Sequence, residues 1–397
     1  MARKRKARRL LGLAAAFFAA LPAPAALFDS AKIGAAENEI LFSKKFPREW
    51  GVRVVDLFVG PDRKPVLVAN VEREYRTFRD RPTASVVRRI HRIKLLRLLA
   101  NGGVDAAFAG NARHYLDMKR PPGFAKPYFG GDGFDHWGAY DWGYEAAFVL
   151  PQPDGSLWIG ASFQEAVMTR RLALISVDEA GKETRLPQEA AEKAFADWSR
   201  RALDDASRKR LKQLRPSMSN AVAPDLKGGW WLGSYSAAAA KAAEPAVEHY
   251  AADFSRDPSF VCDLTPAAGA KGLRVERLHV LPDGRLIAAY YDQLRAYRRL
   301  SGPDWAESDK EYRVARLEPD GKVDRRFEEN AARWNPTFDV PVDRVAHDSE
   351  GGVYLFSSHP TFLSGTGRRQ LYADDPRLIR LAPDGRVDPT FAFKPAR

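Results

Sequence analysis

The segment richest in groups that could bind a ligand or move a proton is YFGGDGFDHWGAYDWGYE, from Tyr128 to Glu145. Aromatic rings alternate there with carboxylates, one histidine and several glycines. Rings beside carboxylates suit stacking on sugar rings with hydrogen bonds to hydroxyls, and loops on a rigid scaffold often carry such groups. The candidate ligand-binding residues are Asp132, Asp135, His136, Trp137, Tyr140, Asp141, Trp142 and Tyr144.

The same segment also has a structural interpretation, because large rings fill the wedges between sheets that are stacked around an axis. A carboxylate pair acting as acid and base would instead make it a glycosidase or lyase site, but no spacing favours that chemistry over binding. We therefore predict a ligand-binding segment and assign no catalytic residue.

Other signatures of chemistry are missing from the sequence. It contains no zincin motif, phosphate loop, nucleophile elbow or paired-cysteine motif. The seven histidines lie singly, without the spacing of metal ligands, and are interpreted as structural. Asp320 and Asp384 lie in turns, whereas a calcium loop needs several oxygen ligands around one point. We expect no metal and no cofactor.

A basic run, RRIHRIKLLRLL, extends from Arg88 to Leu99. Its middle alternates charged and apolar residues, which predicts a half-exposed outer strand whose charges discourage pairing at a sheet edge. The alternative is a surface patch for an anionic polymer.

The first 25 residues have the layout of a secretory signal. Six Lys or Arg without an acid precede an apolar run from Leu10 to Leu21, and small residues follow at 23–25. The run is short for a spanning helix of about 20 residues. We predict cleavage near Ala25 and a secreted or periplasmic protein; an uncleaved membrane anchor is the alternative.

The net charge and the cysteine content limit which partners and which stabilising bonds the chain can have. The net charge of +12 falls to about +6 once the six charges of residues 1–25 are subtracted, which weakens any argument for nucleic-acid binding. The single cysteine, Cys262, cannot form an internal disulfide. A chain that is 45% hydrophobic and 11% aromatic can instead build a packed core.

One phrase recurs along the chain. LEPDGKVDRRF (317–327) returns as LAPDGRVDPTF (381–391) and as LLANGGVDAAF (98–108). Proline, aspartate and glycine favour a tight turn, and the alternation of Val323, Arg325 and Phe327 predicts a strand after it. Degenerate copies are predicted at 175–186 and 261–273.

A second family of hairpins alternates with this phrase. Its members are 57–71, 148–163, 220–235, 278–291 and 345–358. Two hairpins make a four-stranded antiparallel unit, and five such units follow one another. Because one unit cannot bury both of its faces alone, radial stacking into a β-propeller is the predicted fold.

Two segments interrupt the repeats. Residues 188–214 are rich in helix formers with apolar residues at helical spacing, and we predict one or two helices there. Residues 236–254 are a second helical candidate, broken at Pro245. Both inserts are expected to lie on a face of the propeller.

The paired pattern of an apolar hairpin followed by RLxPDGxVDxxF resembles the delta-60 repeat, a bacterial β-propeller-type repeat. The resemblance covers about residues 50–393. It implies an all-β propeller of four-stranded antiparallel blades with helical inserts: five blades by repeat count, or six or seven if other segments hide strands. The N-terminal segment 26–49 contains strand-like NEILFSKKF, which could complete the last blade and close the ring.

Fold alone does not determine function. The analogy favours an exported, non-enzymatic binding or scaffold protein of the bacterial envelope, a monomer contacting protein or glycan and no nucleic acid. The alternative is an enzyme with its active site on a propeller face, of the glycosidase, lyase or lactonase type, acting on a carbohydrate-related substrate.

Overall fold

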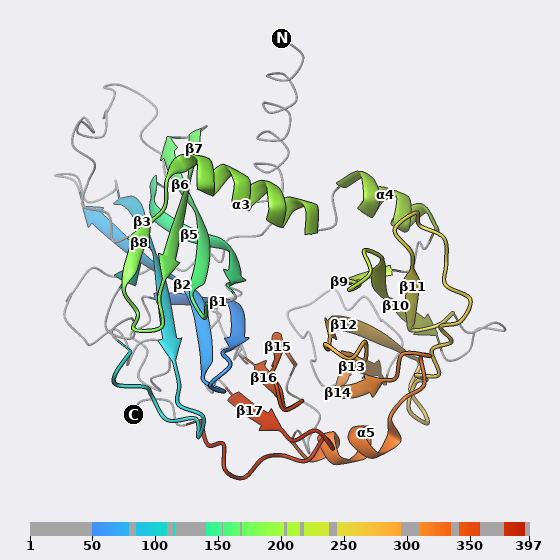
Figure 1. Cartoon of the computed structure of the whole chain (residues 1–397). Helices are drawn as coiled ribbons and strands as arrows, with labels where there is room; N and C mark the ends of the chain where they lie inside the picture. Colours follow the sequence, from blue (N-terminus) through green and yellow to red (C-terminus); the bar gives the residue numbers. More distant parts are fainter. Residues whose placement is uncertain are drawn as a thin grey trace.

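The computed structural model shows a chain built mostly of antiparallel strands (Figure 1). It describes residues 50–78, 85–108, 114–115, 140–152, 154–166, 169–201, 205–214, 218–237, 244–294, 310–334, 341–357 and 377–393. The predicted signal and the N-terminal segment 26–49 lie outside these ranges. No helix in the described ranges is long and apolar enough to cross a bilayer.

The strands form five antiparallel groups in chain order, which we call units 1 to 5. Unit 1 contains β1 (Trp50–Val59), β2 (Pro65–Phe78) and β3 (Ser85–Arg97), with β4 (His114–Tyr115) beside β3. Unit 2 contains β5 (Tyr140–Pro151), β6 (Leu157–Ala166), β7 (Thr169–Val177) and β8 (Glu183–Arg185). Unit 3 contains β9 (Met218–Pro224), β10 (Trp230–Ala237) and β11 (Val247–Tyr250). Unit 4 contains β12 (Gly272–Val280), β13 (Leu286–Gln293) and β14 (Lys310–Leu317). Unit 5 contains β15 (Arg344–His347), β16 (Val353–Ser357) and β17 (Arg377–Leu381).

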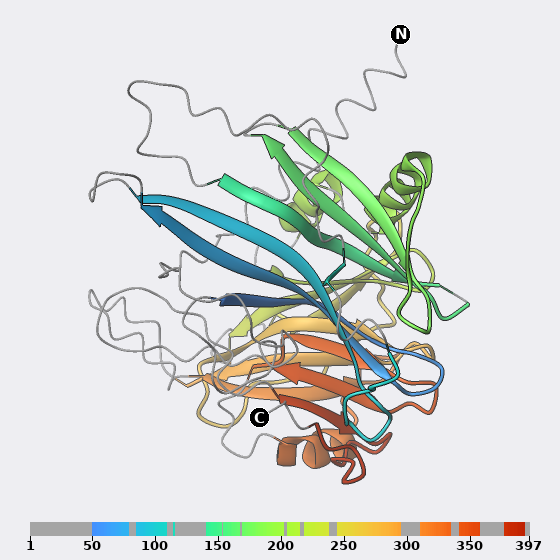
Figure 2. The ribbon, with the colours of Figure 1, turned by 90° about the vertical axis from the view of Figure 1, so that its left-hand side faces the viewer.

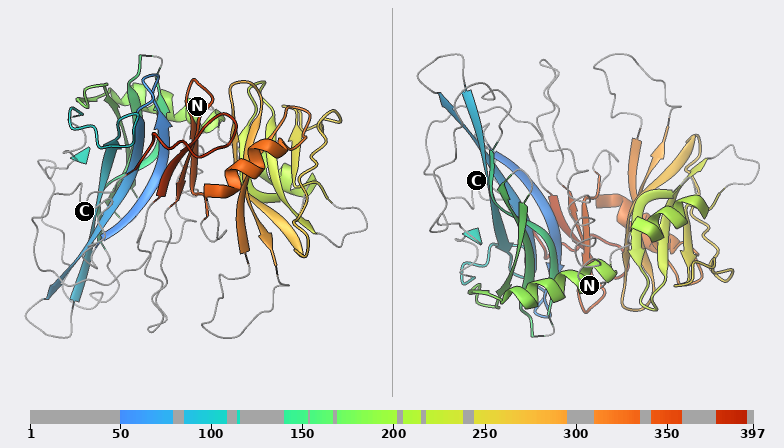
Figure 3. Two further views of the ribbon diagram at one scale, coloured as in Figure 1. Left: turned by 90° about the horizontal axis from the view of Figure 1, so that it is seen from below. Right: turned by 90° about the horizontal axis from the view of Figure 1, so that it is seen from above.

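The units are joined into larger sheets and stacked side by side. Units 1 and 2 form one sheet through β3 and β5, units 3 and 4 form a second, and unit 5 forms a third. Figure 3 shows unit 5 between the other two sheets. The first strands of neighbouring units also pack together: β1 against β5 and β15, and β12 against β9 and β15. This is the radial arrangement that the repeats predicted.

Tight turns gather at one end of the units. The turns between first and second strands, and those after the third strands, lie together on the right of Figure 2. In most units the predicted fourth strand is a single β-bridge, because the chain leaves the sheet directly after the turn. The bridges are Leu98 to Val104, Tyr250 to Arg256, Leu317 to Val323 and Leu381 to Val387.

The repeated phrase has a common structure in three units. Its arginine, at the end of the third strand, pairs with the aspartate eight residues later, and the phenylalanine follows after three more. The sets are Arg97–Asp105–Phe108, Arg316–Asp324–Phe327 and Arg380–Asp388–Phe391. The Arg97 Nε lies 2.9 Å from an Asp105 oxygen, and its guanidinium carbon lies 4.3 Å from the centre of the Phe108 ring. Arg316 lies 4.5 Å from the Phe327 ring. We call this arrangement the staple.

The aspartate of the staple also ends the strand. Asp324 accepts a hydrogen bond from the Phe327 amide and caps helix α5 (Arg325–Ala331), which continues into the 3-10 helix η3 (Ala332–Trp334). The predicted strand through Val323, Arg325 and Phe327 is therefore wrong beyond the bridge. An aspartate at the N-cap satisfies an orphan amide of the first helical turn, which outweighs a short alternating pattern.

Unit 3 contains a staple that the sequence analysis missed. His249 occupies the arginine position, and its Nδ1 lies 2.8 Å from an Asp257 oxygen. Its ring stacks on Trp231 with centroids 4.0 Å apart, and Trp231 meets Phe260 edge to face at 4.7 Å. Residues 249–260 are thus the degenerate copy of the phrase.

Two predictions for this region are corrected. The copy assigned to 261–273 follows the real one. The helix predicted at 236–254 is wrong in its described part, since Ser236 and Ala237 end β10 and 247–250 form β11. Alanines favoured a helix, but Val247 is fully buried in the core between units 3 and 4, which stabilises the strand instead.

A second recurring contact joins consecutive units. The glycine of the turn after the third strand has a positive φ and lies against the backbone of the preceding unit. The pairs are Gly102 with Ala392, Gly321 with Val261 and Gly385 with Phe327. A Cβ on these glycines would come within 2.4 to 2.6 Å of backbone atoms. The pair of Gly102 and Ala392 links unit 1 to unit 5 and thereby closes the series on itself.

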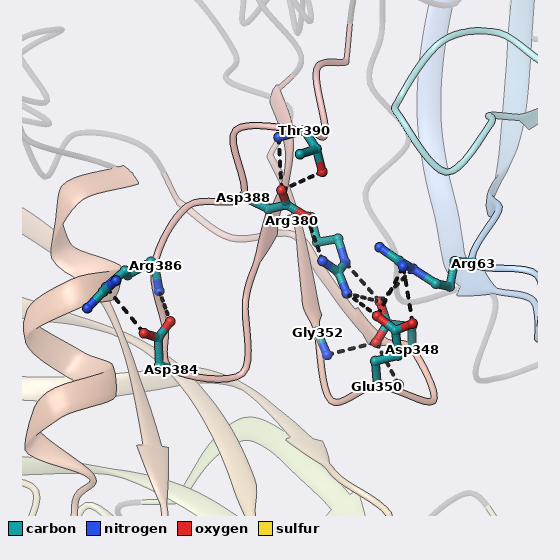
Figure 4. A network of polar contacts seen from close by, with 9 residues as sticks. All are labelled: Arg63, Asp348, Glu350, Gly352, Arg380, Asp384, Arg386, Asp388 and Thr390. Carbon is teal, nitrogen blue, oxygen red and sulfur yellow. Dashed lines mark hydrogen bonds and ion pairs between the residues drawn. The ribbon is translucent and has the colours of Figure 1, made fainter.

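Ionic contacts support the same closure (Figure 4). Buried Arg380 holds Asp348 at 2.9 Å through Nε and Asp388 at 2.5 Å through a terminal nitrogen. Arg63, in the turn between β1 and β2, reaches from unit 1 to Glu350 at 3.0 Å. Ionic contacts made by two turns of unit 5 therefore connect the staple of that unit to unit 1.

Units 2 and 3 are connected differently. Residues of the first predicted insert form helices α3 (Gln188–Arg201) and α4 (Asp205–Leu214), which pass from unit 2 toward unit 3 in Figure 1. On α3, Trp198 stacks on Phe148 of unit 2 with centroids 5.0 Å apart. On α4, fully buried Leu211 packs against unit 3. Among the described residues, no buried apolar cluster joins these two units directly.

The docking glycines give a first prediction. Gly385→Ala should lower the free energy of unfolding more than Gly284→Ala. Both positions have a positive φ, which costs an L-residue about 1–2 kcal/mol. Only at Gly385 does the new methyl meet the neighbouring unit, which adds about 1–3 kcal/mol, whereas no atom lies within 4 Å at Gly284. Denaturant unfolding measures both, and equal losses would contradict the docking role.

Candidate functional site

The predicted ligand-binding residues are only partly within the described structure. Asp132, Asp135, His136 and Trp137 lie outside the described residues. Tyr140, Asp141, Trp142 and Tyr144 lie in the first half of β5. The described part of the predicted loop is therefore strand, which holds these four positions on a regular backbone.

The start of β5 pairs in parallel with the start of β3. Tyr140 is in register with Arg88, and Trp142 with Ile90. The basic run is thus flanked by β2 on one side and by β5 on the other, and the edge-strand interpretation is wrong here. Further along β3, Lys94 is buried, which an outer strand would not require. The structure brings together two segments whose relation the sequence did not reveal.

A second group of polar residues lies on the first strands of units 1, 4 and 5. In units 1 and 4 this strand has a bulge, and the residue directly after it is Asp56 or Arg277. Counting back from the turn places Arg344 at the same register in unit 5. We call Asp56, Arg277 and Arg344, with nearby His279 and His347, the inner-strand cluster.

The two arginines of this cluster bind the backbone of the next unit. Arg344 donates from Nε to the Val55 carbonyl at 2.7 Å and from a terminal nitrogen to the Val54 carbonyl at 2.9 Å. Arg277 donates from Nε to the Asp343 carbonyl at 3.2 Å. Guanidinium groups thereby satisfy carbonyls that lie at or beside the irregular positions of neighbouring strands.

In unit 1 the same register holds an aspartate, Asp56, instead of an arginine. Burial raises the pKa of its carboxyl to about 6, against the opposing effects of the Leu57 amide, which donates to it at 2.9 Å, and of the Arg344 guanidinium. A carboxyl that titrates near neutrality beside a guanidinium can act as a general acid or base if a substrate reaches it.

Two histidines meet between units 4 and 5. His279 Nε2 lies 2.8 Å from His347 Nδ1, so one ring donates and the other accepts. Burial and the neighbouring His347 lower the pKa of His279 to about 3, and burial also lowers that of His347. These two histidines, which lie far apart in the sequence, therefore form a neutral structural contact.

The sequence carried a weak signal for the inner-strand cluster. Asp56, Arg277 and Arg344 each interrupt an apolar strand shortly before a turn, in VVDLFV, VERLHV and DRVAH. Single sequences give no bulge position, so the shared register was not recognised. In the part of the chain that the structure describes, no group of three or more His, Cys, Asp or Glu side chains could hold a metal ion.

Comparisons with known proteins agree with the fold class. The family model described as a domain of unknown function (DUF5122) beta-propeller matches residues 364–391, which include Asp388 and Phe391 of the staple in unit 5. This match supports a β-propeller-type repeat. No curated protein matches the chain in sequence.

Similar solved structures are distant. The mannose phosphorylase MPT-4 from Leishmania mexicana, in complex with phosphate ion, is 10% identical with a TM-score of 0.28, covering 98% of this chain and 99% of that one. The α-L-arabinofuranosidase CtGH43 from Clostridium thermocellum is 9% identical with a TM-score of 0.25, covering 89% and 96%. At these scores the similarities carry no argument about function.

The histidine pair predicts how stability depends on acid. Below about pH 6.5 the unfolded chain binds a proton at His279 that the folded chain does not bind until about pH 3, so stability falls as the pH falls through this window. Each pH unit costs about 1.4 kcal/mol from this group. His279→Gln keeps a hydrogen bond to His347 without titrating and should flatten the slope between pH 6 and 4. Equal slopes in denaturant titrations would contradict this.

Asp56 predicts the opposite trend. Its folded pKa is raised from 3.8 to about 6, so its contribution is fully present below pH 3.8 and is lost as the pH rises through 6. Asp56→Asn should therefore be more stable than the wild type at pH 8, by about 3 kcal/mol at most, with the difference vanishing toward pH 4. Exposed Asp62, in the adjacent turn, provides the Asp→Asn control. No gain at pH 8 would show that Asp56 is well solvated.

Proposed function

We propose that the chain is an exported five-bladed β-propeller of the bacterial envelope, of the delta-60 repeat type, that binds a glycan or a protein without catalysing a reaction. Units 1 to 5 correspond to the five blades. Residues 1–25 serve as the export signal in this proposal, and the exported protein acts as a monomer in the periplasm or outside the cell, with no nucleic-acid partner.

The pairing of β3 with β5 carries the binding proposal. It places the series from Tyr140 to Gly143 in register with that from Arg88 to His91. Aromatic residues and arginines on adjacent strands can stack on sugar rings and bond their polar substituents. Both series lie at strand starts, away from the tight turns that the staples occupy, and this end of a scaffold is free to carry binding residues.

The ionic groups of the repeats support a role without catalysis. The aspartates of the staples are engaged by arginine or histidine and by backbone amides, and the pKa values of Asp105, Asp324 and Asp388 are lowered. Such groups stabilise the units and stay charged, so they are poor acids or bases near neutral pH.

A propeller enzyme of the glycosidase, lyase or lactonase type is the second candidate, favoured by the raised pKa of Asp56. A working site needs the substrate to reach Asp56 and a second group to complement it. Turnover of a carbohydrate or lactone by the wild-type protein, lost in Asp56→Asn, would establish this alternative in place of binding.

A glycan and polysaccharide screen tests the main proposal. Trp142→Ala should lose most of the binding that the wild-type chain shows, because the substitution removes a stacking aromatic ring from β5 without changing the net charge. Trp230→Ala, in β10 of unit 3, is the aromatic control and should bind normally. Full binding by folded Trp142→Ala would remove β5 from the site, and absence of binding by the wild type would favour a protein scaffold.

A further inference from the structure

Four of the five junctions between neighbouring units contain a shared buried core. One apolar cluster combines units 1 and 5, a second units 1 and 2, a third units 3 and 4, and a fourth units 4 and 5. First strands pack together at the same four junctions. In the described ranges, no cluster contains residues of both unit 2 and unit 3, and β5 has no comparable packing on β9.

Helix α3 covers the face of unit 2 that points away from unit 1. On β7, Ala173 and Ile175 lie in the core shared with unit 1, whereas Leu174 between them packs with Ala191 and Ala194 of α3. Successive residues of a strand point to opposite faces, so the two cores lie on opposite sides of unit 2.

Helix α4 covers the corresponding face of unit 3. On β10, Trp231 lies in the core shared with unit 4, whereas the next residue, fully buried Leu232, packs with Leu211 of α4. The turn after β11 also contacts this helix, because the Arg210 guanidinium lies 4.7 Å from the ring of Phe254. Phe254 has a positive φ at the position of the docking glycine, so this turn is held by α4.

The outward surfaces of the two helices are polar. Glu189, Glu192 and Lys193 are exposed on α3, and Lys209 and Lys212 are exposed on α4. In a stack of repeats, the elements at the two ends carry polar outer faces because no further repeat buries them. The five units therefore have the arrangement of a stack in the order 3, 4, 5, 1, 2, with one helix covering each end.

We propose that this stack is open between units 2 and 3, and that α3 and α4 form a strap that lets the two end units move apart and together. The other four junctions stay closed because each contains a buried core. The helices follow one another in the chain (Figure 1) and are packed on different units, so they limit the separation of the ends without fixing it. A partner that contacts both end units would then favour one separation over the others.

Distances between pairs of labels test the opening. In full-length protein with Cys262→Ala, pairs of cysteines carry nitroxide labels in the turns after the third strands. The pair Ala180→Cys and Ala252→Cys spans units 2 and 3 and should give a broad distance distribution in pulsed electron paramagnetic resonance. The pair Ala100→Cys and Ala180→Cys spans the closed junction of units 1 and 2, and as the matched control it should give a narrow one.

A substitution in the strap provides a second measurement. Trp198→Ala removes the ring of α3 that stacks on Phe148 with centroids 5.0 Å apart. It should broaden the distribution between units 2 and 3 further, because α3 is held less firmly, and leave that between units 1 and 2 unchanged. A folded Trp198→Ala variant with both distributions unchanged would overturn the role of the strap.

The comparison of the two label pairs decides the proposal. Equally narrow distributions would show that units 2 and 3 are closed, and equally broad ones would show that the looseness is not confined to this junction; either result overturns the proposal. Should an alanine variant fail to fold, Asp154→Cys with Lys227→Cys spans the same junction in the turns between first and second strands. A narrow distribution from that pair would also contradict the opening.

Discussion

The staple between a basic side chain at the end of the third strand and an aspartate eight residues later is the interaction on which the rest of the structure depends. In four units the outer strand is only a bridge, so few backbone hydrogen bonds, such as that from the Asp324 amide to the Arg316 carbonyl at 2.8 Å, hold the turn to the sheet. The ion pair adds to these bonds, and in units 1 and 4 the guanidinium also lies over the phenylalanine ring. The turn then presents its glycine to the preceding unit, which links local structure to assembly.

Differences in the staple between units explain where the series of units is irregular. Unit 2 has Ser176 and Thr184 at the positions of the arginine and the aspartate, and its chain continues as strand β8 into α3. Unit 3 has Phe254 in the left-handed position that glycine fills elsewhere, and the Arg210 guanidinium of α4 lies 4.7 Å from that ring. The helices connect units 2 and 3, where the turn of unit 3 lacks the docking glycine.

The sequence predicted what is local and missed what is not. Turns and strands followed from PDG and from period-two alternation, because backbone preferences act over a few residues. His249 was not recognised as a staple residue because an alanine-rich stretch favoured a helix and because histidine replaces the arginine of the other copies. The pairing of β3 with β5 joins residues about 50 apart, which no local pattern encodes. The inner-strand cluster depends on bulges, which depend on both strands of a pair.

The charged residues of this chain therefore differ in role with their distance from the turns. At the turn end, acids and bases are paired within the staples and in the network of Arg63, Asp348 and Arg380, so their chemistry is used in holding the units together. At the other end, in register with β5, Arg88 lies between tyrosines rather than acids. Lys94 lies on the same face of β3, between Arg88 and Leu96, and is buried, so the fold itself places a cation on this face closer to the turns.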